Sequence, residues 1–153
     1  MYTNEKTAEV LNDLIRINND RIEGYNKAAD EAANKDVDLQ AIFRQMAAES
    51  RSYVNDLSKY VAGSGEKLET DTTFRGKIYR AWMDVKATFT GKDRKSILAS
   101  CEYGEDAAQK AYDAALSSDA ELTTEIRQLI MDQKTSLKRS HDIIKKMRDA
   151  QPA

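Results

Sequence analysis

Four long stretches of the sequence repeat apolar residues at steps of three and four, and one polar residue interrupts the apolar series in each stretch. Such steps place side chains on one face of an α-helix, so each stretch predicts a long helix with one buried face. The interrupting residues are Asn18, Glu49, Glu105 and Gln133. A chain with this pattern must bury four polar side chains together with its apolar faces.

The expected helices cover about residues 4–34, 38–62, 93–116, and the stretch from a break at 117–119 to about residue 149. Short breaks join the first helix to the second and the third to the fourth, which predicts two antiparallel hairpins. Residues 66–93 connect the hairpins, and the apolar spacing from Phe74 to Phe89 predicts a crossover with a shorter helix of its own. We therefore expect an all-α, antiparallel four-helix bundle, formed by residues 1–153 as a single domain.

The composition argues against several classes of function. Charged residues make up 33% of the chain and there is one proline, which is typical of a helical protein with a charged surface. The formal net charge of −2 provides no overall attraction to nucleic acids or to anionic membranes, so neither is an expected partner. No phosphate-binding glycine loop and no nucleophile–base constellation is present, and we expect no enzymatic activity.

Cysteine content and hydropathy bear on the cellular location. Cys101 is the only cysteine, which excludes an intrachain disulfide and a multi-cysteine metal site. It lies in the apolar series of its helix, so we expect an inert core thiol. No apolar stretch is long enough for a signal peptide or a membrane span. These features predict a cytoplasmic protein.

Two polar residues of the apolar faces are each followed, three residues later, by a serine. The pairs are Glu49 with Ser52 and Gln133 with Ser136. In four-helix bundles that hold a di-iron centre, paired carboxylates are accompanied by a histidine at this spacing. Here the spacing is present and both histidines are absent.

The other two interrupting residues have a matching spacing of their own. Asn18 precedes Tyr25 by seven residues, and Glu105 precedes Tyr112 by seven residues. Seven residues are two helical turns, so each pair lies along one face. Together with the serine pairs, this repeat favours two matching helical hairpins.

Three segments resemble a known family. Residues 97–106, which contain Gly104-Glu105-Asp106, resemble its signature on the third helix, and residues 79–84 resemble its crossover-helix signature. Residues 140–142, Ser-His-Asp, also fit. From about Leu11 to Arg148 the sequence resembles the ferritin and rubrerythrin superfamily, and within it a bacterial ferritin-like family of uncharacterised function. The resemblance implies a ferritin-like bundle and a stress-related role.

In that superfamily, glutamates on the first and third helices and Glu-x-x-His on the second and fourth hold the metals. Carried over by resemblance, these ligands fall on Asn18, Glu49 with Ser52, Glu105, and Gln133 with Ser136. Only Glu49 and Glu105 are good ligands, because asparagine, glutamine and serine are neutral and bind iron weakly. The resemblance therefore implies a degenerate di-metal site.

Two functions follow from these residues. In the first, the chain is a non-catalytic bundle without a cofactor, and it acts through structure or association, as a homodimer formed along helix faces. Its core then contains a polar layer formed by Asn18, Glu49, Ser52, Glu105, Gln133 and Ser136, with Tyr25 and Tyr112 as hydrogen-bond donors. In the alternative, Glu49 and Glu105 weakly bind iron or another divalent cation, and the protein handles metal.

Several charged residues next to these positions have a simpler interpretation. His141 is the only histidine, and we expect it at the surface or at the boundary of the core. Glu102 and Asp106 flank Glu105, and Asp20 and Glu23 lie on the first helix. Their spacing predicts solvent-facing salt bridges for all four.

Overall fold

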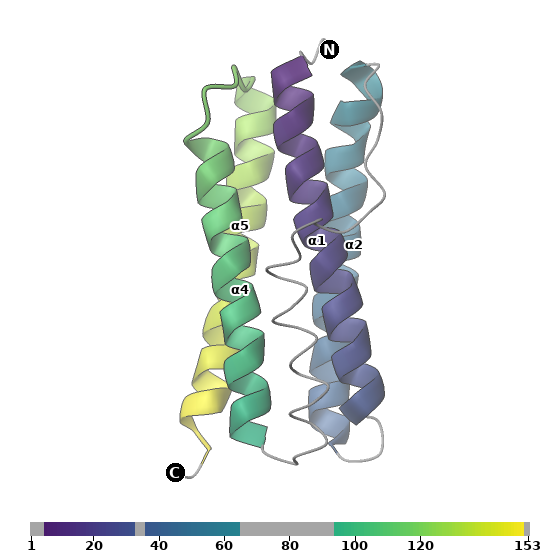
Figure 1. The fold of residues 1–153 in the computed structure, drawn as a ribbon, viewed down its shortest axis with the longest axis vertical. Coiled ribbons are helices and arrows are strands. Elements are labelled where there is room, and N and C mark those ends of the chain that lie inside the picture. The colour runs from purple at the N-terminus through teal and green to yellow at the C-terminus, as the bar shows by residue number, and fades with distance from the viewer. Residues whose placement is uncertain (1–4, 33–35, 65–93, 152–153) are drawn as a thin grey trace.

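The computed structural model of the chain describes residues 5–32, 36–64 and 94–151. These residues form four helices, α1 (Glu5–Ala32), α2 (Val37–Ser64), α4 (Arg94–Leu116) and α5 (Thr124–Asp149), and no strand occurs among them. The prediction of an all-α four-helix bundle is therefore confirmed (Figure 1). The predicted crossover helix from Phe74 to Phe89 lies outside the described residues.

The four helices form two antiparallel hairpins that lie side by side. Helix α1 packs against α2, and α4 packs against α5. The hairpins meet along α1 with α4 and along α2 with α5. In Figure 1, α1 and α5 run downwards and α2 and α4 run upwards, so every pair of neighbouring helices is antiparallel.

Ion pairs link the two hairpins at both ends of the bundle. At one end, Asp36 accepts a hydrogen bond from the backbone N–H of Leu39 (3.1 Å), which caps α2, and also pairs with Arg94 at the start of α4. At the other end, Lys6 of α1 pairs with Asp119 in the loop between α4 and α5. The terminal turns of each hairpin are thereby held against the other hairpin.

Helix α5 begins later than the sequence predicted. We expected the caps from residues 117–119, but the N-cap is Thr123, whose Oγ1 accepts a hydrogen bond from the backbone N–H of Ile126 (3.2 Å). Ser118 instead donates to the carbonyl of Ala115 at the end of α4 (2.8 Å), and Ala120 is buried. The loop therefore packs against the bundle before α5 starts.

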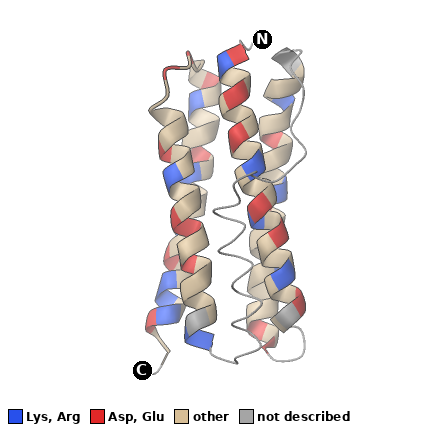
Figure 2. Cartoon of the chain, in the orientation of Figure 1, with Lys and Arg blue, Asp and Glu red and all other residues tan. Residues whose placement is uncertain are grey.

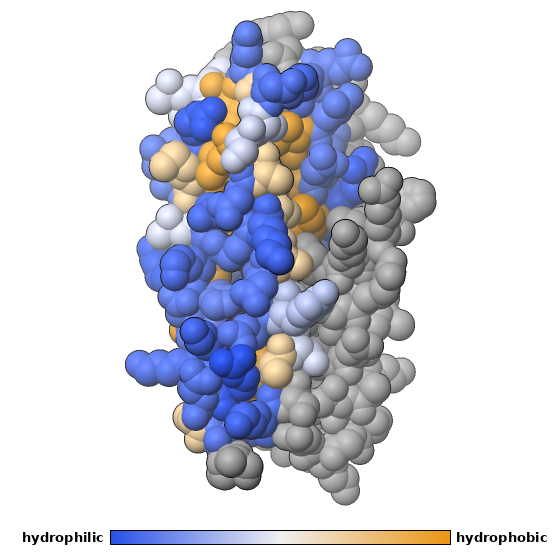
Figure 3. Space-filling model, turned by 60° about the vertical axis from the view of Figure 1, so that its left-hand side comes forward, coloured by the Kyte–Doolittle hydropathy of each residue, from blue (hydrophilic) through white to orange (hydrophobic). Residues whose placement is uncertain are grey.

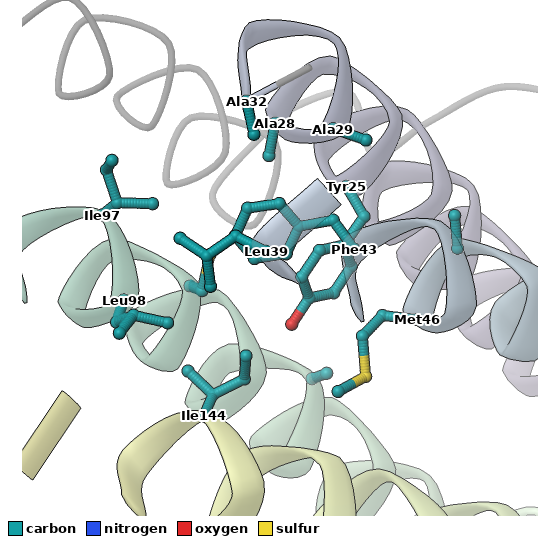
Figure 4. Packing of buried hydrophobic residues seen from close by; sticks show 13 residues of the cluster. Tyr25, Ala28, Ala29, Ala32, Leu39, Phe43, Met46, Ile97, Leu98 and Ile144 are labelled. Carbon is teal, nitrogen blue, oxygen red and sulfur yellow. The ribbon is translucent and has the colours of Figure 1, made fainter. Parts of the chain in front are cut away.

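The apolar core consists of two clusters, one towards each end of the bundle. The cluster around Tyr25 and Phe43 receives side chains from all four helices (Figure 4). The second cluster, around Leu11, Leu57 and Ile130, also draws on all four. Between the two clusters, each helix contributes polar side chains to the interior.

The buried face of α2 differs from the predicted one by a small rotation. Glu49 was expected in the core, but it lies at the edge together with Ile42 and Tyr60, while their neighbours Phe43, Ser50 and Val61 are fully buried. The ring of Phe43 packs on that of Tyr25, with 5.6 Å between the ring centroids. This aromatic contact accounts for the rotation, because it turns residue 43 inwards in place of residue 42.

Charges of both signs alternate over the outer faces of the helices (Figure 2). On the face drawn in Figure 3, hydrophilic residues cover most of the described surface and hydrophobic residues gather in its upper part. Four large apolar side chains are exposed among the described residues: Val37, Tyr103, Met131 and Ile143. Within the described ranges, no helix has the length and hydropathy needed to cross a membrane.

The capping role of Thr123 gives a first test of the fold. Thr123→Ala removes the side-chain acceptor for the N–H of Ile126, and we expect it to lower the free energy of unfolding by about 1 kcal/mol. The matched control is Thr124→Ala, one residue further on, where the side chain is exposed and does not cap the helix. Urea denaturation followed by circular dichroism measures both, and equal stabilities would contradict the assigned cap.

Candidate functional site

The centre of the polar layer is Arg21, a residue that the sequence did not single out. Its side chain is fully buried, and it is the only lysine or arginine in the core of the described residues. The guanidinium forms a two-pronged ion pair with Glu105 of α4. Its Nε lies 2.6 Å from Oε1, and its Nη2 lies 3.1 Å from Oε2. This geometry is the strongest form of arginine–carboxylate pairing.

Helix α2 provides the remaining acceptors of the guanidinium. Nη1 donates to the backbone carbonyl of Met46 and to Oγ of Ser50, both at 2.9 Å. Nη2 also approaches Oε1 of Glu49 at 3.5 Å. The charge of Arg21 is thus surrounded by oxygen atoms from two other helices.

Glu49 connects this ion network to α5 and to solvent. Its Oε1 accepts a hydrogen bond from Oγ of Ser140 on α5 (3.0 Å). The side chain of Glu49 is 29% exposed, whereas that of Glu105 is 1% exposed. The two carboxylates share one nitrogen of Arg21, but only Glu49 is in contact with water.

A chain of neutral hydrogen bonds continues from Arg21 across the bundle. Ser50, which accepts from Arg21, donates to Oδ1 of Asn18 (2.8 Å). Nδ2 of Asn18 donates to the hydroxyl of Tyr112 (2.8 Å), and this hydroxyl donates to Oε1 of Gln133 (2.7 Å). Nε2 of Gln133 donates to the carbonyl of Tyr53 (3.3 Å). Each hydroxyl in the chain accepts one bond and donates one, so its polar atoms are satisfied in the interior.

The electrostatics of the layer follow from burial and from these charges. Burial opposes the charged form of Arg21, but Glu105 and then Glu49 reverse this effect and hold the pKa of Arg21 above its ordinary value. Burial raises the pKa of the Tyr112 phenol, although the hydrogen bond from Asn18 favours its ionised form. Burial and then the negative charge of Glu105 raise the pKa of the Cys101 thiol. Cys101 is fully buried and protonated, which is the state of an unreactive core thiol.

Tyr25 provides an aromatic wall beside the ion pair. Cζ of Arg21 lies 5.1 Å from the centroid of the Tyr25 ring, which is a cation–π distance. Burial and the charge of Glu105 raise the pKa of its phenol well above the ordinary value. Tyr25 therefore joins the layer through its ring face.

The predicted members of the layer divide into two groups. Asn18, Glu105, Gln133, Tyr25 and Tyr112 are buried and lie together. Glu49 and Ser136 are half-buried, and Ser136 accepts a hydrogen bond from the hydroxyl of Tyr53.

The prediction for Ser52 was wrong. Ser52 is exposed and lies outside the polar layer, because the buried face of α2 steps from Met46 through Ser50 to Tyr53. Ser50 therefore takes the serine position in the layer. Glu49 lies at the edge of the core, and Ser52, three residues later, lies on the exposed face of α2.

Of the members of the layer that were missed, Arg21 and Ser50 each had a signal in the sequence. Arg21 lies three residues after Asn18 and four before Tyr25, which places it on the same helical face. Ser50 lies four residues after Met46 and three before Tyr53, so it also shares a helical face with both. The spacing of Arg21 and Ser50 places both on the buried faces of their helices. They were left out of the predicted core only because their side chains are polar.

Two of the four flanking acids were also predicted incorrectly. Asp20 is fully buried, and Glu102 is 9% exposed, paired with Arg148 and 3.8 Å from Nε2 of His141. Asp106 is exposed as expected and lies 2.6 Å from Nε2 of His141, which stands at the boundary between α4 and α5. The charge of Glu102 is paired with the guanidinium of Arg148 at the edge of the core.

A di-metal centre does not fit the residues of the polar layer. Arg21 puts a positive charge between Glu49 and Glu105, where a metal ion would be repelled. The amides of Asn18 and Gln133 are occupied by hydrogen bonds within the layer. Across residues 5–32, 36–64 and 94–151, no group of three or more His, Cys, Asp or Glu side chains is arranged to hold a metal ion.

Comparison with protein families matches residues 6–118 to a family described as "Domain of unknown function (DUF2383)". The chain belongs to the DUF2383 family. The matched residues contain α1, α2 and α4, and with them Arg21 and all its acceptors, whereas α5 lies beyond the match. This confirms that the family is one of unknown function, while the relationship to ferritins stays a prediction. No curated protein matches the sequence.

The ion pair of this DUF2383 chain gives a sharp stability test. Arg21→Met leaves Glu105 buried without its cation, and we expect the free energy of unfolding at pH 7 to fall by about 3–5 kcal/mol. Arg16→Met is the control, because Arg16 lies on the same helix, pairs with Asp13 and is partly exposed; its cost should stay within about 1 kcal/mol.

A double variant isolates the cause of that loss. Arg21→Met combined with Glu105→Gln removes the uncompensated charge, and we expect it to recover a large part of the stability that Arg21→Met loses. Urea denaturation of the single and double variants measures the coupling. A double variant less stable than Arg21→Met would contradict the assigned ion pair.

The buried phenol of Tyr112 predicts the alkaline limit of the fold. Its folded pKa lies above the ordinary value of 10.0, so above about pH 10 the unfolded chain releases a proton that the folded chain keeps. The stability that the protonated Tyr112 phenol contributes to the fold is therefore fully present below pH 10 and is lost as the pH rises further. Tyr112→Phe should show a shallower decline in urea midpoint between pH 9 and about pH 12 than the native chain. Tyr103→Phe, at an exposed position, is the control and should decline as the native chain does.

Proposed function

We propose that this DUF2383 chain is a non-catalytic, ferritin-like bundle protein in which a buried polar layer replaces a degenerate di-metal site. The observation that carries the proposal is the guanidinium of Arg21, paired with Glu105 and adjoining Glu49. A side chain fixed in this position supplies the positive charge that metal ions would otherwise supply to the two carboxylates. The buried carboxylate of Glu105 is therefore paired with a cation without any cofactor.

The environment of the layer supports a structural role. It lies between two apolar clusters, and its hydroxyls and amides are used within a single chain of hydrogen bonds. A catalytic site needs reactive groups that a substrate can reach, whereas here Glu49 and Ser136 are only partly open to solvent and the other members of the layer are buried. The interior therefore serves to join the hairpins.

The outer faces of the helices then become the working surface of the protein. We propose that the chain acts through association, as a cytoplasmic homodimer formed along helix faces, in a stress-related role. Exposed apolar side chains such as Tyr103 and Ile143, set among charges of both signs, support an interaction surface.

One observation favours the alternative, a weak metal-binding or iron-handling protein. Glu49 and Glu105 each place an oxygen within 3.5 Å of the same nitrogen of Arg21, so the two carboxylates converge on one point. A cation could bind there only if the guanidinium moved away. The cost of exposing that buried charge counts against this function.

The metal content of the purified protein separates the two functions. We would incubate the native chain anaerobically with ferrous iron, and in parallel with manganese or zinc, desalt it, and measure metal per chain by elemental analysis. We expect no retained metal and no change in melting temperature. The matched control is the double variant Glu49→Gln, Glu105→Gln, which removes both candidate ligands.

Two results would contradict the proposal. About two irons per chain would mean that other ligands complete a di-iron site. Retention of about one metal ion that is lost in the double variant would favour the metal-handling function.

A further inference from the structure

The guanidinium of Arg21 is surrounded by oxygen atoms of the kinds that coordinate a bound metal cation. It contacts five oxygen atoms: both carboxylate oxygens of Glu105, one of Glu49, the hydroxyl of Ser50 and the carbonyl of Met46. Among the residues that the structure describes, the thioether of Met46 is the one further acceptor, at 3.4 Å. Carboxylate, hydroxyl and carbonyl oxygens are the donors that hard divalent cations prefer.

From this arrangement we propose that Arg21 is the built-in cation of a cation-binding cavity, and that its side chain alone keeps divalent ions out. Truncating Arg21 then creates a site for one hard divalent cation on Glu49 and Glu105. The inference rests on the proposed function, in which the polar layer replaces a metal site. It adds that the cavity accepts a hard divalent cation once the Arg21 side chain is absent.

The charge balance supports a divalent occupant. Two carboxylates and one guanidinium leave one net negative charge, and the half-exposed Glu49 carries that excess towards water. Without Arg21 the same oxygens carry two negative charges, which one divalent ion neutralises. A single ion of this charge suits the cavity better than a di-metal centre, since only two carboxylates are present.

The cavity also has the size and the opening that an ion requires. Arg21 is among the largest fully buried side chains of the described residues, so its removal leaves a polar space that water and an ion can fill. Glu49 lies at the edge of α2 that faces α5, with its side chain partly in solvent and bonded to Ser140. An ion can enter past Glu49 without separation of the hairpins.

A built-in cation has a consequence for the native protein. A metal-dependent bundle folds only when its ion is supplied, because binding energy contributes directly to folding. The charge of Arg21 is part of the chain and is always present. We therefore expect the native fold to be independent of metal supply and unchanged by chelators.

Manganese binding to the full-length chain tests this inference. Arg21→Ala is compared with the native chain and with Arg21→Ala combined with Glu105→Gln, in chelator and in millimolar Mn²⁺. Electron paramagnetic resonance counts bound Mn²⁺, and thermal unfolding gives the melting temperature. For Arg21→Ala we expect about one Mn²⁺ per chain and a rise of about 5 °C or more at saturation. The native chain and the double variant should show neither effect.

The outcomes separate this inference from the proposed function. A folded Arg21→Ala chain that binds no more Mn²⁺ than the native chain overturns the inference and leaves the proposed function standing. Metal retained by the native chain contradicts both. Equal binding by the double variant shows that Glu105 is not a ligand, which also overturns the inference.

A second variant covers the case in which Arg21→Ala fails to fold in chelator. Arg21→Asn places a short amide oxygen in the cavity and reduces the space left empty. Helical content, measured by circular dichroism, should return in Mn²⁺ for either variant, because the ion replaces the lost charge. If both variants remain unfolded in millimolar Mn²⁺, the cavity does not accept a divalent cation and the inference is overturned.

Discussion

Arg21 and Glu105 meet in the middle of the bundle, where burying either charge without the other would cost several kcal/mol. Arg21 lies on α1 and Glu105 on α4, so the pair forms only when the two hairpins are aligned along their length. The acceptors on α2 impose the same condition on the first hairpin. The apolar clusters on either side depend on this alignment, and they in turn keep water away from the pair.

The polar layer determines the arrangement of the helices more than it determines the total stability. A buried ion pair often contributes little beyond what an apolar pair of similar size would contribute. Apolar contacts, however, tolerate many packings, whereas the hydrogen bonds from Ser50 through Asn18 to Tyr112 need one specific alignment of α2, α1 and α4. We therefore attribute the stability mainly to the two clusters, and the register between the hairpins to the layer between them.

The sequence predicted the elements well and the layer only in part. The apolar series of α4, from Cys101 through Glu105 to Tyr112, matches the buried face, because small and apolar residues there alternate clearly with charges. In α2, Ile42 and Phe43 are both apolar, and local spacing cannot decide which one turns inwards. Arg21 was missed because an arginine is normally expected in water. Its burial depends on Glu105, a partner 84 residues away.

The ion network lies within the residues that match the family, whereas the fourth helix lies outside them. Residues 6–118 include Arg21, Met46, Glu49, Ser50 and Glu105, so the cation and its acceptors lie within the part of the chain that defines DUF2383 membership. Helix α5 lies outside it and closes the layer only through neutral groups, chiefly Gln133 and Ser140. The charged part of the layer and the part that closes it are thus carried by different segments. A change in α5 would alter the neutral end of the layer, where Gln133 accepts from Tyr112, and the exposure of Glu49, which accepts from Ser140.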